Sequence, residues 1–159
     1  LEIHRRRIRF HGIDAPEAGQ TCTRGDEAWP CGRRAAQALQ DFVGRRPVEC
    51  VAEKVDRYGR LDARCSVAGT DIEAWMVREG WALAYRRYSS DYVDEEADAR
   101  AARRNIWSGT MLNPERYRRE QEAAARLQRR LTDCAPPPRR SSASTPDRTP
   151  AVENDCVRN

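Results

Sequence analysis

Hydrophobic and polar positions alternate along several short runs of this chain. Residues 2–4 and 8–10 read as two strands around the basic turn at residues 5–7. Residues 48–54 and 61–67 form a second pair of such runs. Alternation with a period of two is typical of half-buried strands, so the pattern predicts two hairpins. The two histidines, His4 and His11, are expected on the surfaces of the first two strands.

A helical period replaces the alternation after Pro30, a residue that fits the first turn of a helix. Ala35, Leu39 and Phe42 follow helical spacing, and Gly44 marks its end. We expect this helix to pack against the core and to carry no chemistry.

Two further helices are predicted before residue 109. Thr70 and Glu73 have the spacing of a capping box, which would open a short helix that stops at Gly80. Ser90 is the expected cap of the next helix, because acidic residues follow it and arginines end the segment. Asn105 is a plausible left-handed stop.

The C-terminal part of the chain has a different composition. Asn113 and Pro114 begin another predicted helix, and proline, serine and arginine dominate from Thr132 onward. Such a composition is typical of disorder. The predicted organisation is a barrel-like domain at 1–109, a C-terminal helix at 110–131 and a disordered tail at 132–159.

Composition limits the class of protein. The chain has 159 residues, 39% of them hydrophobic and 34% charged, which supports one small core. No apolar run approaches the ~20 residues of a membrane span. The formal charge of +4 mildly favours a polyanionic partner. Lys54 is the only lysine, and the abundance of arginine reflects either composition bias or phosphate binding.

The six cysteines allow fifteen disulfide connectivities. Cys50 and Cys65 lie at equal distances from the centre of one predicted turn, so they would face each other in a hairpin. Buried free thiols are the alternative. The sequence has no Cys-x-x-Cys pair, so a zinc site is not expected. Spacing along the chain suggests three local pairs: Cys22 with Cys31, Cys50 with Cys65, and Cys134 with Cys156.

Disulfide bonds would place the protein in an oxidising compartment, which means secreted or periplasmic. Leu1 is not a methionine, and residues 1–3 already read as strand. We therefore expect an upstream segment, where a leader would lie.

The stretch from Arg9 to Glu17 carries the most informative chemistry. Pro16 cannot continue a central strand, so Asp14 and Glu17 are expected on a bend at a strand end, with Arg9 behind them. Two carboxylates and a guanidinium are the groups that hold a divalent cation and a phosphate. The alternative is a charged turn with surface ion pairs.

Three blocks together resemble the staphylococcal-nuclease-like (thermonuclease) family. They are Arg9…Asp14-Ala15-Pro16-Glu17, Asp56-Arg57-Tyr58-Gly59-Arg60 and Asn105-Ile106-Trp107-Ser108, in the order and at the approximate spacing of that family. The resemblance covers residues 1–109. It implies an α+β, mainly β fold: a small five-stranded barrel of the oligonucleotide-binding (OB) type with three packed helices.

The resemblance also implies roles for single residues. Asp14 would bind Ca²⁺ together with the main-chain carbonyl of Ala15, and Glu17 would hold or activate the attacking water. Arg9 and Arg60 would grip the phosphate and stabilise its growing charge.

Other positions would bind the substrate. Arg57 and Tyr58 match positions that line the family's nucleotide site. Tyr85 and Tyr88 would stack on a base or serve as core and rim aromatics. The family's first metal aspartate has no counterpart here, and we expect it upstream of Leu1.

Three functions remain open from the sequence. The first is a calcium-dependent nuclease, a monomer that hydrolyses DNA or RNA, single-stranded or locally opened. The second is a non-catalytic nucleic-acid-binding barrel. The third is an envelope-associated interaction protein that works through its C-terminal helix and tail.

Overall fold

The computed structural model describes residues 2, 3 and 5–133. Residues 134–159 of the predicted disordered tail, and with them the Cys134–Cys156 pair, lie outside the described residues, whereas Thr132 and Asp133 belong to a helix. The described chain divides into two compact units, Leu1–Arg118 and a second that begins at Arg119. Within the described residues, no helix is both long and apolar enough to cross a bilayer.

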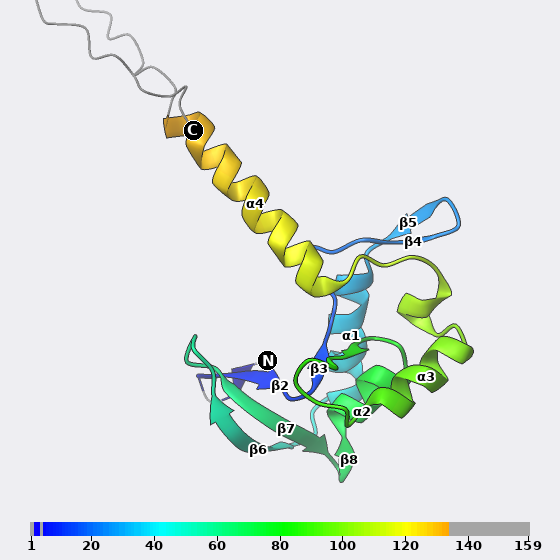
Figure 1. Cartoon of the computed structure of the whole chain (residues 1–159). Helices are drawn as coiled ribbons and strands as arrows, with labels where there is room; N and C mark the ends of the chain where they lie inside the picture. Colours follow the sequence, from blue (N-terminus) through cyan, green and yellow to red (C-terminus); the bar gives the residue numbers. More distant parts are fainter. Residues whose placement is uncertain (1, 4, 134–159) are drawn as a thin grey trace, which may run out of the picture. The chain divides into compact units, whose positions relative to one another are not determined.

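Strands and helices are interspersed along the chain (Figure 1). The strands are β1 (Glu2–Ile3), β2 (Arg6–Phe10), β3 (Ile13–Asp14), β4 (Cys22–Arg24), β5 (Glu27–Trp29), β6 (Val48–Val55), β7 (Leu61–Val67), β8 (Thr70–Asp71) and β9 (Leu83–Ala84). The helices are α1 (Cys31–Val43), α2 (Ile72–Arg78), α3 (Val93–Ala101), the 3₁₀ helix η1 (Asn105–Ser108) and α4 (Pro114–Asp133).

The main sheet has the strand order β1-β2-β7-β6, with β8 paired to the end of β7. Strands β2 and β7 run parallel, whereas β6 and β7 form the predicted antiparallel hairpin. The fold is mixed α/β rather than mainly β. Among the described residues the sheet is open, with β1 and β6 at its edges, so the predicted barrel is not seen closed.

One core lies between the inner face of the main sheet and the helices. Figure 1 shows α2 beside β8 and the end of β7. The rings of Phe42 in α1 and Trp75 in α2 stack with centroids 3.9 Å apart. The predicted role of α1 in packing is confirmed, because Leu39 and Phe42 lie against this core. The buried members of the core are Ile8, Ile13, Ala63, Cys65, Val67, Ile72, Met76, Val77, Ala82, Ala84 and Tyr92.

Two of the predicted disulfide bonds are present. Cys50 lies directly opposite Cys65 in the β6–β7 register, with Cα atoms 4.1 Å apart. Cys22 pairs with Cys31 across a Cα distance of 5.6 Å. The Cys22–Cys31 bond joins the β4–β5 hairpin to the first residue of α1.

Two predicted helix caps are wrong. Asp71, not Thr70, caps α2, because its carboxylate accepts a 2.7 Å hydrogen bond from the Ala74 amide. Thr70 instead pairs with Val67 as part of β8. No side chain caps α3, which begins after Tyr92 rather than at Ser90.

The capping box fails because Glu73 has a different partner. Its side chain is completely buried, and its carboxyl oxygens accept hydrogen bonds of 3.0 and 3.1 Å from the Cys65 amide. Burial is the largest influence on the pKa of Glu73 and raises it to about 8. Glu73 therefore ties α2 to β7 as a largely protonated acid at neutral pH.

This burial predicts a pH-dependent stability. Glu73 keeps its proton to about pH 8 in the folded protein, whereas it releases the proton near pH 4.5 in the unfolded chain. The contribution of protonated Glu73 to stability is therefore complete below pH 4.5 and is lost as the pH rises to 8. The Glu73→Gln variant cannot titrate. The free energy of unfolding of the wild type should therefore fall relative to this variant by roughly 3 to 4 kcal/mol between pH 5 and 8.

Denaturant unfolding of both proteins at several pH values measures this difference. The exposed Glu49→Gln variant on β6 is the control and should run parallel to the wild type. A constant difference between wild type and Glu73→Gln would contradict the prediction.

Candidate functional site

The corner between β2 and β3 fixes the first carboxylate of the site. Gly12 makes the turn with a positive φ of 67°, where a Cβ would come within 3.0 Å of the Tyr92 ring. Asp14 then pairs with Leu83 of β9, and the Gly12 carbonyl accepts a 2.8 Å hydrogen bond from the Tyr85 amide. The Asp14 side chain is only 12% exposed. Backbone pairing on both sides of the turn therefore holds this carboxylate at the strand end, as the sequence predicted.

A tight turn after Pro16 fixes the second carboxylate. The Gln20 amide donates to the Glu17 carbonyl at 2.7 Å, and the Glu17 amide donates to Gln20 Oε1 at 3.1 Å. Gln20 Nε2 donates in turn to the Leu112 carbonyl at 2.5 Å, so this side chain, 1% exposed, joins the turn to a distant segment. The side chain of Glu17 stays 43% exposed. Hydrogen bonds thus fix the backbone of Glu17, while its carboxylate remains accessible to solvent.

The start of α1 packs directly on this turn. A Cβ on Gly32 would lie 1.7 Å from the Glu17 carbonyl oxygen, so any residue other than glycine would clash there. The Gly32 amide also donates to the Gln20 carbonyl at 3.2 Å. The neighbouring Cys31 is fixed by its disulfide bond to Cys22. Helix α1 thus supports the turn, although it brings no charged side chain to it.

A guanidinium from the first turns of α4 binds both carboxylates. Arg118 donates through Nη1 and Nη2 to the two oxygens of Asp14 at 3.0 and 2.9 Å. Nη1 also donates to Glu17 Oε1 at 2.8 Å. The hydrogen bond with Asp14 is the largest of the influences that raise the pKa of Arg118 further above its ordinary value. Asp14 and Glu17 therefore converge on one positively charged group.

Arg9 lies beside two tyrosines near this corner. Its guanidinium carbon is 5.6 Å from the centroid of the Tyr85 ring and 5.3 Å from that of Tyr88. Burial is the largest of the influences that raise the pKa of Tyr85, and the charges of Glu115 and Asp14 add to it. Tyr88 is 53% exposed, so one face of this cluster is open to a ligand.

The turn between β6 and β7 holds the second predicted arginine. Asp56 accepts hydrogen bonds from the Tyr58 and Arg60 amides, each at 2.9 Å, and from Arg60 Nε at 2.7 Å. Burial raises the pKa of Asp56, but these hydrogen bonds together outweigh it and lower that pKa to about 2. Arg57 and Arg60 both lie over the ring of Tyr58, which is 58% exposed.

Alternation continued for one residue before β7 puts Arg60 on the same face of the sheet as Arg9. Ile8 pairs with Leu61 across β2 and β7, and both line an apolar cavity of about 230 Å³ on the inner face. Side chains alternate between the two faces of a strand. Arg9 follows Ile8 and Arg60 precedes Leu61, so both belong to the opposite, outer face.

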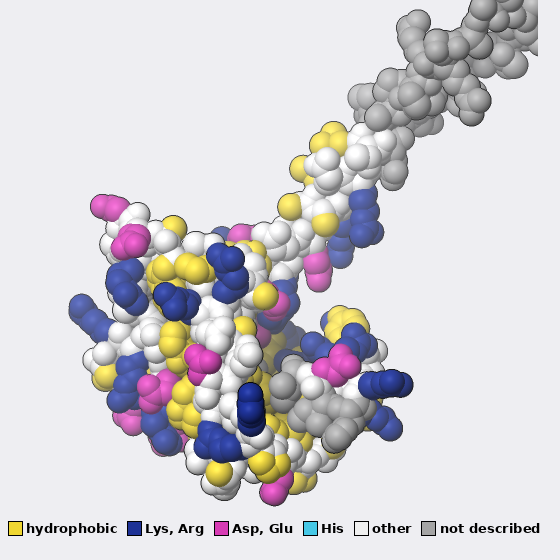
Figure 2. Space-filling view, turned by 180° about the vertical axis from the view of Figure 1, so that it is seen from behind, with side chains coloured by type: hydrophobic (Ala, Val, Ile, Leu, Met, Phe, Trp, Pro, Cys, Tyr) yellow, Lys and Arg dark blue, Asp and Glu magenta, His cyan; other side chains and the backbone are white. Residues whose placement is uncertain are grey.

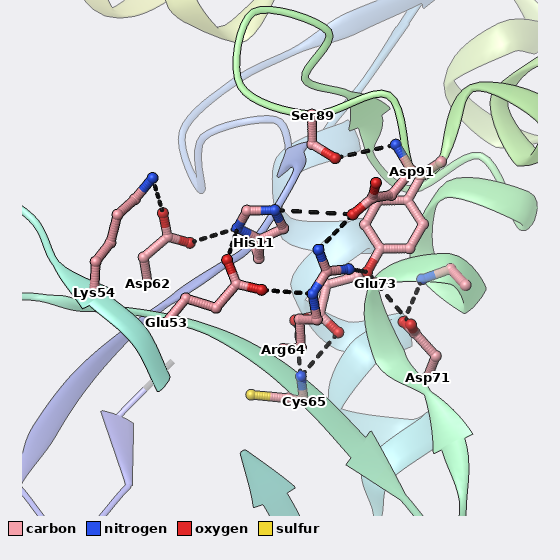
Figure 3. A network of polar contacts seen from close by, with 12 residues as sticks. His11, Glu53, Lys54, Asp62, Arg64, Cys65, Asp71, Glu73, Ser89 and Asp91 are labelled. Atoms are coloured by element: carbon pink, nitrogen blue, oxygen red, sulfur yellow. Dashed lines mark hydrogen bonds and ion pairs between the residues drawn. The ribbon is translucent and has the colours of Figure 1, made fainter. Parts of the chain in front are cut away.

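His11 is buried rather than on the strand surface, and the prediction for it is wrong. Its side chain lies between carboxylates from three segments (Figure 3). Nδ1 is 3.3 Å from both Glu53 and Asp62, and Nε2 is 3.9 Å from Asp91. Arg64 binds Glu53 at 2.6 Å and also pairs with Asp91. This network fastens the β2–β3 corner to the β6–β7 hairpin.

Charge is distributed rather than concentrated on the face that Figure 2 displays. Basic side chains there are interspersed with acidic and apolar ones. Within residues 5–133, no group of three or more histidine, cysteine, aspartate or glutamate side chains is placed to hold a metal ion. The described part of the chain thus offers two carboxylates, Asp14 and Glu17, rather than a complete set of side-chain ligands.

Comparison with known proteins identifies the family to which the chain belongs. The family model described as "Staphylococcal nuclease homologue" matches residues 7–109. This chain belongs to that family. The match covers most of β2, all of β3 and the β6–β7 hairpin, and every predicted site residue except Cys134 and Cys156.

Individual relatives carry names of the same kind. A micrococcal nuclease of Shigella flexneri is 36% identical over 132 residues, which are 74% of this chain and 71% of that protein. A probable endonuclease of Clavispora lusitaniae is 31% identical over 127 residues, 71% of this chain but only 53% of the relative. An uncharacterized endonuclease of Haemophilus influenzae is 29% identical over 119 residues, 73% of this chain and 62% of the relative. These similarities support nuclease activity for this member of the family.

Contacts within this staphylococcal nuclease homologue join the predicted site residues into three groups. Asp14 and Glu17 share Arg118, Arg9 lies against Tyr85 and Tyr88, and Arg57, Tyr58 and Arg60 share the β6–β7 turn. Ala15 lies in the loop between the two carboxylates.

Sequence reasoning missed Gln20 and Arg118. Gln20 stands in a loop without a recognisable motif. Its importance appears only in the structure, where its buried side chain accepts from the Glu17 amide and donates to the Leu112 carbonyl. Arg118 is one of many arginines in a segment that the resemblance did not cover. No local signal distinguishes it from its neighbours.

The role of Gln20 can be measured directly. Gln20→Ala removes both side-chain hydrogen bonds, so the free energy of unfolding should fall by about 2 kcal/mol. Hydrogen exchange at the Glu17 amide should become faster, because that amide loses its acceptor. The control is Gln37→Ala, where an exposed glutamine loses only a bond to Asp41 within α1. Unchanged exchange at Glu17 in the first variant would show that Gln20 does not hold the turn.

Proposed function

We propose that this protein is a calcium-dependent nuclease that hydrolyses phosphodiester bonds of DNA or RNA. The observation that carries the proposal is the convergence of Asp14 and Glu17 on a single cationic group. Family membership and relatives named nuclease or endonuclease point the same way. We also propose that the sheet completes a five-stranded barrel of the OB type.

The donor set fits a hard cation. Two carboxylates that converge on positive charge, with the Ala15 carbonyl between them in sequence, are the oxygen ligands that Ca²⁺ accepts in irregular geometry. The Arg118 guanidinium stands in for a cation at these oxygens. When bound, Ca²⁺ would neutralise phosphate charge and make the phosphorus more electrophilic.

Glu17 is the residue that we assign to the attacking water. Its carboxylate is 43% exposed, whereas that of Asp14 is 12% exposed, so Glu17 is the one that water reaches more readily. A carboxylate within hydrogen-bond reach can orient a water molecule and accept its proton. The bonds that Gln20 makes to the Glu17 backbone would keep this carboxylate in position.

Arg9 and Arg60 are assigned to the phosphate. Both occupy the outer face of the sheet, and guanidinium groups bind phosphate oxygens in two places. Their aromatic and acidic neighbours restrict their motion before substrate binds. Restricted donors stabilise the charge that develops on the phosphate without a large cost of reorganisation.

Exposed aromatic rings are assigned to the nucleotide bases. Tyr58 and Tyr88 are more than half exposed, and Arg57 and Tyr85 lie beside them. Bases stack on such rings only where they are unpaired, which favours a single-stranded or locally opened substrate. The two disulfide bonds favour a secreted or periplasmic location, and we propose that the protein acts there as a monomer.

One observation favours the second candidate, a non-catalytic nucleic-acid-binding protein. The described residues bring only two carboxylates to the site, and an arginine pairs with both. Such a protein would bind nucleic acid with a strong dependence on salt and would not cleave it.

Changing Glu17 to Gln separates these functions. If Glu17 accepts a proton from water, the turnover rate for single-stranded DNA with Ca²⁺ should fall at least about 100-fold. Binding of the same DNA in the presence of a chelator should change little, because the phosphate contacts remain. Cleavage is measured by release of labelled fragments.

Glu27→Gln, on the exposed hairpin strand β5, is the matched control and should cleave like the wild type. Equal turnover of Glu17→Gln and the wild type would exclude the assigned role. Binding without any cleavage by the wild type, with and without Ca²⁺, would establish the non-catalytic alternative instead.

A further inference from the structure

Arg118 occupies the oxygens that the proposed cation would need. Both Asp14 oxygens and Glu17 Oε1 accept its hydrogen bonds, at 2.8 to 3.0 Å. The Arg118 side chain is 37% exposed and that of Asp14 is 12% exposed, so the pair is partly withdrawn from solvent. Parallel donation to both oxygens of one carboxylate is the strong, directional form of such a bond.

The start of α4 is anchored to the same part of the fold. The side chain and the carbonyl of Asn113 accept hydrogen bonds of 2.9 Å from the Glu115 and Tyr117 amides, which fixes the first turn of the helix. The Leu112 carbonyl is bound by Gln20 at 2.5 Å, and Tyr85 donates to Glu115 at 3.3 Å. These contacts lie within the unit that ends at Arg118. Hydrogen bonds therefore fix the start of the helix that carries Arg118, and this holds its side chain near the carboxylates.

Occupation of these oxygens has a direct consequence for a metal ion. A divalent cation must sit within bonding distance of the carboxylate oxygens, in the direction from which the guanidinium now approaches. Two positive groups that close to each other repel strongly, so both cannot hold Asp14 and Glu17 in this way. Either the guanidinium leaves or the cation binds more weakly.

We propose that Arg118 is an internal cation that competes with Ca²⁺ for Asp14 and Glu17, which makes the start of α4 an autoinhibitory contact. The inference rests on the proposed function, because it requires the metal site to lie at these carboxylates. In the absence of metal, Arg118 balances two acidic groups that would otherwise repel each other. When the calcium concentration rises, the ion displaces the guanidinium and opens the site.

The test is calorimetric titration of the full chain with calcium chloride. Arg118→Gln removes the competitor and should bind Ca²⁺ about tenfold more tightly than the wild type. Arg118→Lys keeps the charge but cannot grip both carboxylates in parallel, so its affinity should lie between the two. Arg126→Gln is the matched control: it makes the same change in net charge on the same helix, where Arg126 pairs only weakly with Glu122 at 3.8 Å. The control should bind like the wild type.

A second readout does not involve calcium. In the presence of a chelator, Arg118→Gln should melt at a lower temperature than Arg126→Gln, because only the former leaves two neighbouring carboxylates without a counter-charge. With saturating Ca²⁺ this deficit should disappear. If Arg118→Gln fails to fold without metal, the melting temperature of Arg118→Lys is compared with that of Arg126→Gln instead.

The outcomes separate this inference from the proposed function. Equal calcium affinities for the wild type, Arg118→Gln and Arg118→Lys would overturn the competition while leaving the metal site in place. Loss of calcium binding in Asp14→Asn, together with tighter binding in Arg118→Gln, would support both. Absence of calcium binding in every variant would overturn the metal site and the competition together.

Discussion

Electrostatic pairing at one corner of the sheet determines how the candidate site is organised. Asp14 and Glu17 are close enough to share one guanidinium, and Asp14 is largely removed from water. Two carboxylates in such a place repel each other and require a positive partner. Arg118 supplies that charge in this structure, and the same requirement makes the corner suitable for a divalent cation. The other proposed roles, for Arg9, Arg60 and the tyrosines, depend on this arrangement.

The surroundings of the corner restrict its shape rather than add chemistry. Gly12 and β9 fix Asp14, while Gln20 and the start of α1 fix the turn that carries Glu17. The His11 network holds the neighbouring hairpin against the β2–β3 corner, and the Cys50–Cys65 bond joins the two strands of that hairpin. Preorganisation of this kind lets a site bind charge without first ordering its own side chains.

Local patterns in the sequence were sufficient for much of this fold. The β6–β7 hairpin, α1 and the start of α4 follow from alternation, helical period and turn residues, and the Cys50–Cys65 pair follows from the register. The failures involve partners that are distant along the chain. Glu73 leaves its predicted cap because burial against Cys65 satisfies it. Arg118 meets Asp14 from 104 positions away, a contact that no local pattern encodes.

The most direct test of this account is a crystal structure of the chain grown with saturating calcium. In that structure an ion should lie about 2.3–2.6 Å from a carboxylate oxygen of Asp14. Arg118 would then have left both Asp14 and Glu17. An ion bound elsewhere, with Arg118 still donating to both carboxylates, would contradict the claim that this corner is a cation site.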